Sequence, residues 1–287
     1  MIFFTPKATI NRLIYKGMIE SEMKLFLQSV KDKYGYDFTE YKTASLQRRL
    51  SIFLSTSEKH SLTELLPVLL HDQTEFETLV NVLTINMTEM FRDPEVFRFI
   101  RENLIPTLAT FPHINIWSAG SSTGQEAYSL AILLQEEGIY NRSHIYGTDI
   151  NTPNITDAKK GIYFENDFRE YSANYISSGG HHSLFDYCHI NYGKGIITES
   201  IRKNVSFFKH NLVCDNSFIE AQMIMCSNVF IYFNETLQKR VLDLFYNSLH
   251  HSGFLILGIK EKVPEFMLGK KFEKISPKFP VYRKING

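Results

Sequence analysis

The first hundred residues place apolar and polar side chains at the spacing of amphipathic helices. Segments 61–64 (SLTE) and 74–77 (TEFE) each pair a hydroxyl residue with a glutamate three positions on, which is typical of a capping box. Asp93 followed by Pro94 indicates another helix start, with an end expected before Pro106. We therefore predict an N-terminal helical domain with a linker helix over residues 19–104. The apolar positions that open this pattern are Met23, Leu25, Phe26 and Val30.

From about residue 112 the pattern changes to short, mostly apolar runs that are typical of buried strands. Helical patterns at 124–138 and 234–250 alternate with these runs. Alternating strands and helices predict a parallel sheet with helices on both faces, so residues 105–287 are expected to form an α/β domain. The expected strands are 114–119, 144–150, 205–212, 222–229 and 253–258.

Two segments depart from this alternation. Residues 272–284 contain two β-prone pieces around a proline-containing break, which predicts an antiparallel hairpin at the edge of the sheet. Residues from about 165 to 200 are rich in Gly, His and Tyr and interrupt the strand–helix order. We interpret this second segment as a small inserted subdomain or a long loop.

The composition is that of a globular chain without net charge. Lys and Arg number 31, as do Asp and Glu, which disfavours a wholesale electrostatic grip on nucleic acid or an anionic membrane. No apolar run approaches the roughly 20 residues of a membrane span. We interpret residues 1–18 as an N-terminal extension, with Met18 as an alternative start. A cytoplasmic protein is expected, because the cysteines lack the spacing of a disulfide framework or zinc site: Cys188, Cys214 and Cys226.

Candidate chemistry lies where the first predicted strand ends, in the run WSAGSSTGQEAYS at 117–129. Gly120 and Gly124 would let the backbone approach a ligand at the carboxyl edge of the sheet. Glu126, in the first helical turn, would repel a diphosphate but suits a ligand with a cationic end. Asp149 closes the second strand, where an acid commonly accepts hydrogen bonds from ribose hydroxyls.

Together these features indicate a nucleoside that carries an amino acid, S-adenosylmethionine. The alternative is that Gly120 and Gly124 only permit tight packing, and that Asp149 is a solvated strand end.

Four motifs in order, from about residue 25 to 285, resemble the signature segments of one family. YGYDFTEYKTASLQRRL (34–50) is similar to its helical signature, and NMTEMFR (86–92) to its N-x-T-x-F-F-R segment. WSAGSSTGQEAYS resembles W-S-A-x-x-S-T-G-E-E-P-Y-S, and CSNVFIYF (226–233) resembles C-R-N-V-x-I-Y-F. In these motifs the chain resembles the CheR family of chemotaxis receptor methyltransferases. The resemblance implies a Rossmann-like methyltransferase domain with an N-terminal helical domain and a small inserted β-subdomain.

The resemblance also implies the residues that hold the methyl donor. Ser227 stands at a cofactor-binding position where the family usually has arginine, and GIKE (258–261) replaces G-H-S-E while keeping Glu261. The first departure puts cofactor affinity or turnover in question. The implied cofactor contacts are Asn86, Thr88, Arg92, Glu126, Asp149, Asn211, Leu212 and Asn228.

Two residues are candidates for the transfer itself. Methylation of a carboxylate needs no general base, because glutamate is ionised at neutral pH. Arg92 would hold the carboxylate of the substrate or of the cofactor, and the Tyr232 hydroxyl would orient the incoming carboxylate. The alternative for Arg92 is that it is a solvated arginine at a helix start. The alternative for Tyr232 is that it is an aromatic residue of the core.

The expected function is methylation of glutamate side chains on the cytoplasmic domain of a methyl-accepting receptor. A basic cluster, Lys42, Arg48 and Arg49, would dock on acidic receptor helices, unless it is only a solvated face. The inserted subdomain docks a receptor tail peptide in some members. One rival is a cofactor-binding regulatory scaffold with weakened turnover. A second is a methyltransferase for RNA or a small molecule. No metal site is expected, since His181, His182, Cys188 and His189 match no zinc pattern.

Overall fold

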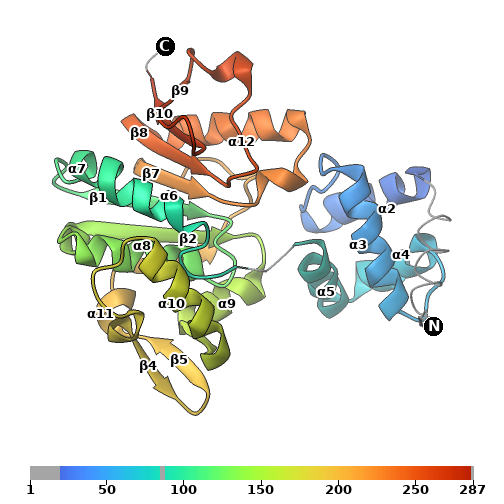
Figure 1. Cartoon of the computed structure of the whole chain (residues 1–287). Helices are drawn as coiled ribbons and strands as arrows, with labels where there is room; N and C mark the ends of the chain where they lie inside the picture. Colours follow the sequence, from blue (N-terminus) through green and yellow to red (C-terminus); the bar gives the residue numbers. More distant parts are fainter. Residues whose placement is uncertain (1–19, 85–87, 286–287) are drawn as a thin grey trace, which may run out of the picture. The chain divides into compact units, whose positions relative to one another are not determined.

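The computed structural model describes residues 20–84 and 88–285 (Figure 1). The suggested extension at 1–18 and the cofactor candidate Asn86 lie outside these residues. The chain divides into two compact units, Met1–Ile85 with Tyr232–Gln238 and Asn86–Ile231 with Lys239–Gly287. We call them the helical unit and the sheet unit.

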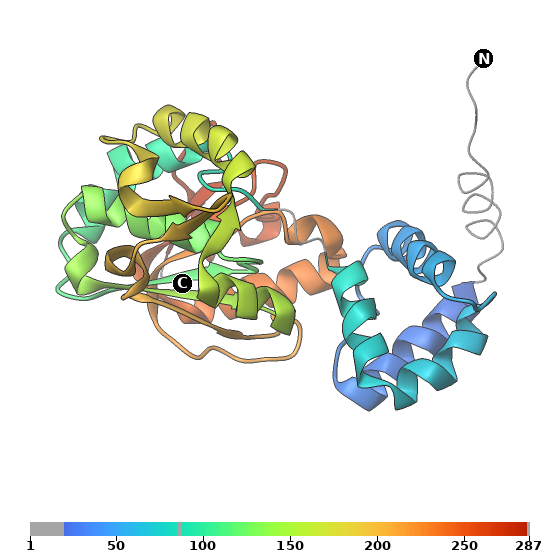
Figure 2. The same ribbon diagram turned by 90° about the horizontal axis from the view of Figure 1, so that it is seen from below.

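The helical unit is a bundle whose helices are shown from two sides in Figures 1 and 2. They are α2 (Glu20–Tyr34), α3 (Thr43–Thr56), α4 (Leu62–His71) and α5 (Gln73–Leu83). Their apolar stripes form one core that includes Met23, Phe26 and Val30. Leu25, expected to belong to the stripe, is 59% exposed, and Leu27 is buried in its place.

The helix starts in this unit confirm one capping prediction and correct another. Ser61 is the N-cap of α4, and its hydroxyl accepts the Glu64 amide at 3.2 Å. Thr74 was expected to cap the next helix but lies inside α5. Asp72 is the N-cap instead, because its carboxylate already accepts the amides of Thr74 and Glu75. A capping acid two residues upstream therefore takes the role.

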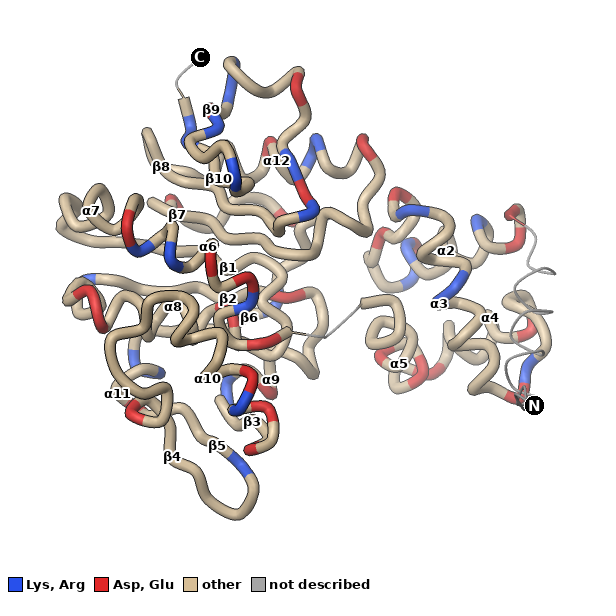
Figure 3. The backbone as a smooth tube through the Cα atoms, in the orientation of Figure 1, with Lys and Arg blue, Asp and Glu red and all other residues tan. Residues whose placement is uncertain are grey.

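Arg49 does not belong to an exposed basic face. Its side chain is buried at 3% exposure; one guanidinium nitrogen donates to the Leu83 carbonyl, and the group lies 4.7 Å from the centre of the Tyr232 ring. Lys42 and Arg48 are exposed. Figure 3 shows charges of both signs in this unit. The predicted basic cluster is thus reduced to two surface cations.

The sheet unit contains a seven-stranded mixed sheet in the order β6-β2-β1-β7-β8-β10-β9. The first five strands in this order are parallel, and β10 and β9 form the antiparallel edge. The predicted α/β fold and edge hairpin are confirmed. The bounds are β1 (Ile114–Ala119), β2 (Ser143–Asp149), β6 (Val205–Lys209), β7 (Ala221–Cys226), β8 (Leu249–Leu257), β9 (Phe272–Lys274) and β10 (Val281–Lys284).

Helices cover both faces of this sheet, as the alternation along β1 shows. Ile116 joins the apolar cluster that contains Leu130 of α8 (Gln125–Glu136). Trp117 points to the other face, where its ring meets Phe245 of α12 (Glu235–Ser248) edge-on at 5.3 Å. The shorter helices of this unit include α9 (Thr152–Lys160), α11 (Glu199–Arg202), η2 (Tyr140–Arg142) and η6 (Glu265–Met267), and η5 (Phe230–Tyr232) begins in it at Phe230.

The linker helix runs past the proline at which it was expected to end. Helix α6 (Pro94–Phe99) continues through a π-helical turn, η1 (Ile100–Leu104), into α7 (Ile105–Leu108). Pro106 lies in the first turn of α7, where its missing amide proton costs little because the wider π turn has already changed the hydrogen-bond register. Pro94 is the first helical residue, as expected, but the Asp93 side chain makes no cap hydrogen bond.

The predicted insert is an α/β subdomain and not a long loop. A three-stranded antiparallel sheet in the order β3-β5-β4 is combined with one longer helix and single turns. The insert begins slightly before residue 165, because β3 is its first strand. Its elements are β3 (Ile162–Phe164), η3 (Glu165–Asp167), α10 (Phe168–Ser177), η4 (Leu184–Tyr187), β4 (Cys188–Asn191) and β5 (Lys194–Ile197).

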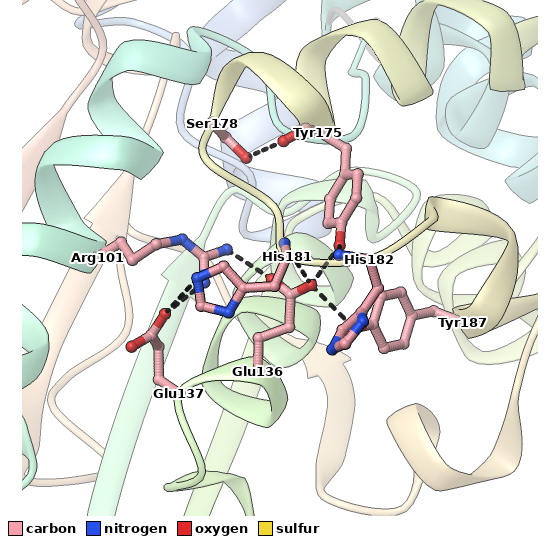
Figure 4. Close-up of polar contacts among 8 residues, drawn as sticks. All are labelled: Arg101, Glu136, Glu137, Tyr175, Ser178, His181, His182 and Tyr187. Atoms are coloured by element: carbon pink, nitrogen blue, oxygen red, sulfur yellow. Dashed lines mark hydrogen bonds and ion pairs between the residues drawn. The ribbon is translucent and has the colours of Figure 1, made fainter.

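A buried ionic hub fixes the insert to the parallel-sheet core (Figure 4). At the end of α8, the Glu136 carboxylate accepts the Arg101 guanidinium at 2.7 Å, the Tyr187 hydroxyl at 2.9 Å and the His181 amide at 3.1 Å. The Tyr175 hydroxyl also donates to Glu136, and Arg101 pairs with Glu137 as well. Although burial opposes ionisation, these donors lower the pKa of Glu136.

In the described ranges, no helix has both the length and the apolar character needed to cross a membrane.

Candidate cofactor site

The candidate residues gather at the carboxyl edge of the sheet, around the end of β1. Strand β1 lies between β2 and β7, and the chain leaves it towards α8, so this is the point where strand order reverses. Ligands of open α/β sheets bind in the crevice at such a point. The walls here are the turn Gly120–Gly124, the end of β2, and the loop Ser227–Ile231 after β7.

The glycine turn is fixed by backbone contacts to the end of β2. The amides of Gly120 and Ser121 both donate to the Thr148 carbonyl at 2.8 Å. Gly120 has φ +74°, and a Cβ there would lie 2.5 Å from Val229 Cγ2, so a side chain would collide with the opposite wall. Packing alone already requires glycine at this position.

Asp149 is buried, which excludes a solvated strand end. It is 8% exposed, and its carboxylate accepts the Ser122 amide at 2.9 Å and the Asn151 amide at 2.8 Å. Burial raises the pKa of this carboxyl group, and the amide hydrogen bonds partly offset that rise. The side-chain amide of Asn154 also donates to this carboxylate at 3.4 Å, and the Ile150 amide is a further donor.

Glu126 lies in the first turn of α8, partly buried, and accepts the Ser118 hydroxyl at 2.7 Å. Burial raises its pKa to about 7, hydrogen bonds from Ser118 and Ser227 lower it, the nearby Glu261 carboxylate raises it, and the charge of Arg92 lowers it. Among the described ion pairs none involves Glu126. A cation brought by a ligand would therefore stabilise the ionised carboxylate.

The loop after β7 begins earlier than the apolar pattern suggested. Strand β7 ends at Cys226, so Ser227 and Asn228, expected within or after a strand reaching 229, form a turn. Asn228 has φ +62°, and its amide donates to Glu261 at 3.0 Å. The Ser227 hydroxyl binds Glu126, so the serine supplies a neutral donor where the family's arginine would supply a cation.

The segment before α6 brings Arg92 close enough to act on Glu126. The Phe91 amide donates to the Ser129 hydroxyl at 2.8 Å, which fixes the segment on α8. Phe91 and Asp93 have φ of 52° and 56°, an unfavourable backbone for non-glycine residues. Thr88 and Arg92 are only partly buried. The described part of this segment is thus held in a strained shape beside the first turn of α8.

Helix α10 of the insert contacts the same segment. The Asn174 amide group donates to the Glu89 carboxylate at 3.1 Å and to the Met90 carbonyl at 3.2 Å. The Tyr175 ring meets the Phe91 ring edge-on at 5.2 Å, and its hydroxyl reaches the ionic hub described above. The insert and the segment around Arg92 therefore share side-chain contacts.

Asn211 and Leu212 lie just beyond the end of β6, beside Asp149. The His210 amide donates to the Asp149 carbonyl at 3.0 Å, and Asn211 Oδ1 accepts the Val213 amide at 3.0 Å, which shapes a tight turn. Both Asn211 and Leu212 are 8% exposed. The expected strand over 205–212 therefore ends early, at Lys209, and its last residues form this turn.

Tyr232 belongs to the helical unit, where it packs under the Arg49 guanidinium. Its carbonyl accepts the Lys42 amide at 2.8 Å. The proposed role of Tyr232 towards a substrate stays a prediction.

Three residues of this edge had no assigned role from the sequence: Ser118, Ser122 and Glu261. Ser118 and Ser122 lie inside the quoted WSAGSSTGQEAYS run, where their contacts to Glu126 and Asp149 depend on the folded turn. Glu261 is separated from Asn228 by 33 positions. The only sequence signal for it was that GIKE keeps the glutamate of the family's G-H-S-E segment.

Comparison with known proteins agrees with this organisation. Residues 21–84 match the CheR methyltransferase all-alpha domain, and residues 86–279 match the CheR methyltransferase SAM binding domain. A Pseudomonas putida protein named "Putative methyltransferase Cher3" is 43% identical over 263 residues, which cover 92% of this chain and 96% of that protein. A chemotaxis protein methyltransferase of Borreliella burgdorferi is 27% identical over 262 residues, which cover 86% of this chain and 90% of that protein.

A chemotaxis protein methyltransferase of Vibrio anguillarum is 29% identical over 265 residues, which cover 89% of this chain and 94% of that protein. Both domains of the family are thus matched in order, and together they span most of the sequence. This chain belongs to the CheR family of S-adenosylmethionine-dependent methyltransferases.

Proposed function

We propose that this protein transfers the methyl group of S-adenosylmethionine to glutamate side chains on the cytoplasmic domain of a methyl-accepting chemoreceptor. The main support is the acidic first turn of α8, where Glu126 has no cationic partner among the described ion pairs while its pKa is raised by burial. A methyl donor with an amino-acid end supplies that cation. Asp149 would accept the ribose hydroxyls.

The transfer would need positioning and exclusion of water more than acid–base catalysis. A carboxylate oxygen of the substrate attacks the methyl carbon, the carbon–sulfur bond breaks, and its electron pair stays on sulfur. The sulfonium and the carboxylate become a neutral thioether and a methyl ester, so a poorly solvated site favours the step. Arg92 would hold the substrate carboxylate or that of the cofactor, and Tyr232 would orient the incoming oxygen.

Recognition of the receptor would use surface features of each unit separately. Lys42 and Arg48 would face acidic receptor helices. On the insert, Phe164 is 68% and Tyr192 is 96% exposed, which would suit an apolar contact with a receptor segment. We place the protein in the cytoplasm on this account, since the receptor's methylated helices lie there.

The test combines purified protein, labelled S-adenosylmethionine and receptor cytoplasmic fragments. We expect label on the receptor that is released by mild base, because carboxyl esters hydrolyse and N-methyl groups do not.

Tyr232→Phe should lower the transfer rate more than the cofactor affinity. Lys42→Glu combined with Arg48→Glu should raise the KM for receptor, while Lys59→Glu, a change at another exposed cation of the helical unit, should not.

A second candidate, a scaffold that binds the cofactor without turnover, is favoured by Ser227 alone. The serine leaves Glu126 with a neutral donor, which weakens the electrostatic support of the site. Tight binding of S-adenosylhomocysteine without base-labile label on any receptor fragment would replace the transferase proposal with this one.

A further inference from the structure

Glu261 is a buried carboxylate that binds only backbone in the described ranges. It is 5% exposed. Its Oε2 accepts the Gly258 amide at 2.7 Å and the Asn228 amide at 3.0 Å, and its Oε1 accepts the Ile231 amide at 3.1 Å. The Phe230 amide is a further donor. An acid that meets several amides is a strong, charge-assisted acceptor.

The position of this carboxylate follows from the parallel pairing of β7 with β8. The last pair in the register joins Cys226 to Leu257. Gly258 follows Leu257 directly and Asn228 lies two residues after Cys226, so both amides lie beyond this last pair. Oε2 of Glu261 accepts both, so one side-chain oxygen closes the end of the ladder.

Closing the ladder also fixes the loop Ser227–Ile231 in a shape that it would not adopt by itself. Asn228 is held with φ +62°, a left-handed conformation that costs free energy for a residue with a Cβ. Its neighbours on both sides form the wall of the candidate site: Ser227 binds Glu126, and Val229 packs against Gly120.

Gly258 makes room for this arrangement. A Cβ at Gly258 would lie 2.7 Å from Glu261 Oε2 and 2.9 Å from the Asn228 amide nitrogen, at distances that would push both groups away. The spacing of Gly258 and Glu261, three residues apart, is therefore a local requirement for the bond between the two loops.

We propose that Glu261 is a positioning residue that holds the loop Ser227–Ile231 in the shape that receives the methyl donor. It acts through backbone amides and need not touch the cofactor. This inference rests on the placement of the cofactor at the end of β1, and it does not depend on which molecule is methylated.

The experiment compares Glu261→Gln with Glu265→Gln in the full chain. Glutamine keeps the size but loses the charge and turns one acceptor into an amide donor, whereas Glu265 is an exposed acid four residues away. Calorimetric titration with S-adenosylhomocysteine gives the affinity, and thermal unfolding without ligand gives the stability. We expect the dissociation constant to rise at least about tenfold in Glu261→Gln and to remain unchanged in Glu265→Gln.

Two further readouts separate positioning from simple stability. In transfer assays, Glu261→Gln should raise the KM for the donor more than it lowers kcat. Glu261→Asp keeps the charge on a shorter side chain, so it should show an intermediate loss of affinity; it also serves if the glutamine variant does not fold. A folded Glu261→Gln variant with lower thermal stability but wild-type affinity would overturn the proposal, as would wild-type affinity in Glu261→Asp if only that variant folds.

The wild-type titration distinguishes this inference from the proposed function. Binding of S-adenosylhomocysteine without transfer to a receptor would overturn the substrate proposal and leave the role of Glu261 open to the comparison above. A wild-type chain that does not bind the ligand would overturn the placement of the cofactor, and the role of Glu261 with it.

Discussion

Cofactor binding should release a proton from Glu126. The carboxyl group has a pKa raised from 4.5 to about 7 by burial and by the nearby Glu261 carboxylate, so near neutrality it is partly protonated before the ligand arrives. The ammonium group of the ligand would bind the ionised form. If it binds only that form, the dissociation constant at pH 6 should be about tenfold higher than at pH 8.

The sign of the same shift can be checked on the free protein. Because the folded pKa lies above the unfolded value, the folded chain holds a proton on Glu126 at pH values where the unfolded chain has released it. The contribution of this group to stability is therefore full below pH 4.5 and is lost as the pH rises through about 7. Cofactor binding should compensate for this loss above pH 7.

Calorimetric titration with S-adenosylhomocysteine measures the linkage, since the amino group of this ligand stays protonated between pH 6 and 8. Repeating the titration in buffers of different ionisation enthalpy counts the protons, and we expect release of close to one per ligand at pH 6 and about a tenth at pH 8. Glu126→Gln should bind weakly and independently of pH. Equal affinity at both pH values in the wild type, or an unchanged pH dependence in Glu126→Gln, would refute the reasoning.

Three other changes should have defined effects. Ser227→Arg should move the midpoint of the pH dependence below 7, because a cation beside Glu126 favours its ionised form; titration between pH 5 and 8 checks this, and an unmoved midpoint would show that the position is neutral. Asp149→Ala should weaken binding of S-adenosylhomocysteine by about 1–3 kcal/mol, and unchanged affinity would remove Asp149 from the site. Glu136→Gln should lower the free energy of unfolding by about 3 kcal/mol, because it removes the buried carboxylate that accepts the donors of the hub and leaves Arg101 with Glu137 as its remaining described ion-pair partner. Denaturant unfolding and amide exchange within 162–197 measure the last effect, with the exposed Glu102→Gln as control, and wild-type protection would contradict it.

The sequence was most informative where the determining contacts are local. The strands of the parallel sheet and the turn from Gly120 to Gly124 follow from apolar runs and from neighbouring residues, and the structure confirms the predicted fold. Helix ends were less predictable, because Asp72 competes with Thr74 as the N-cap and starts the helix earlier by accepting the Thr74 and Glu75 amides, and because a π turn lets the linker helix pass Pro106. Such competition is decided by geometry that residue types alone do not encode.

Contacts between distant positions could not be predicted. Arg49 was assigned to an exposed cluster by its neighbours in sequence, but the Leu83 carbonyl and the Tyr232 ring bury it. Glu136 and Glu261 were not assigned roles, since their donors come from segments far along the chain. For the candidate cofactor residues, the sequence predicted that Glu126 and Asp149 lie at one edge of the sheet, and the folded chain adds the amides and hydroxyls that hold them there.

The ionic hub at Glu136 limits how freely the insert can be exchanged between relatives. A chimera in which this chain received only the segment 162–197 of a relative would replace Asn174, Tyr175 and Tyr187 but keep Arg101 and Glu136. The exchanged segment and the rest of the chain would have to be complementary at the hub and again at Glu89, which Asn174 contacts. We therefore expect the insert to diversify together with the linker helix and the end of α8, as one inherited module with three separate pieces of sequence.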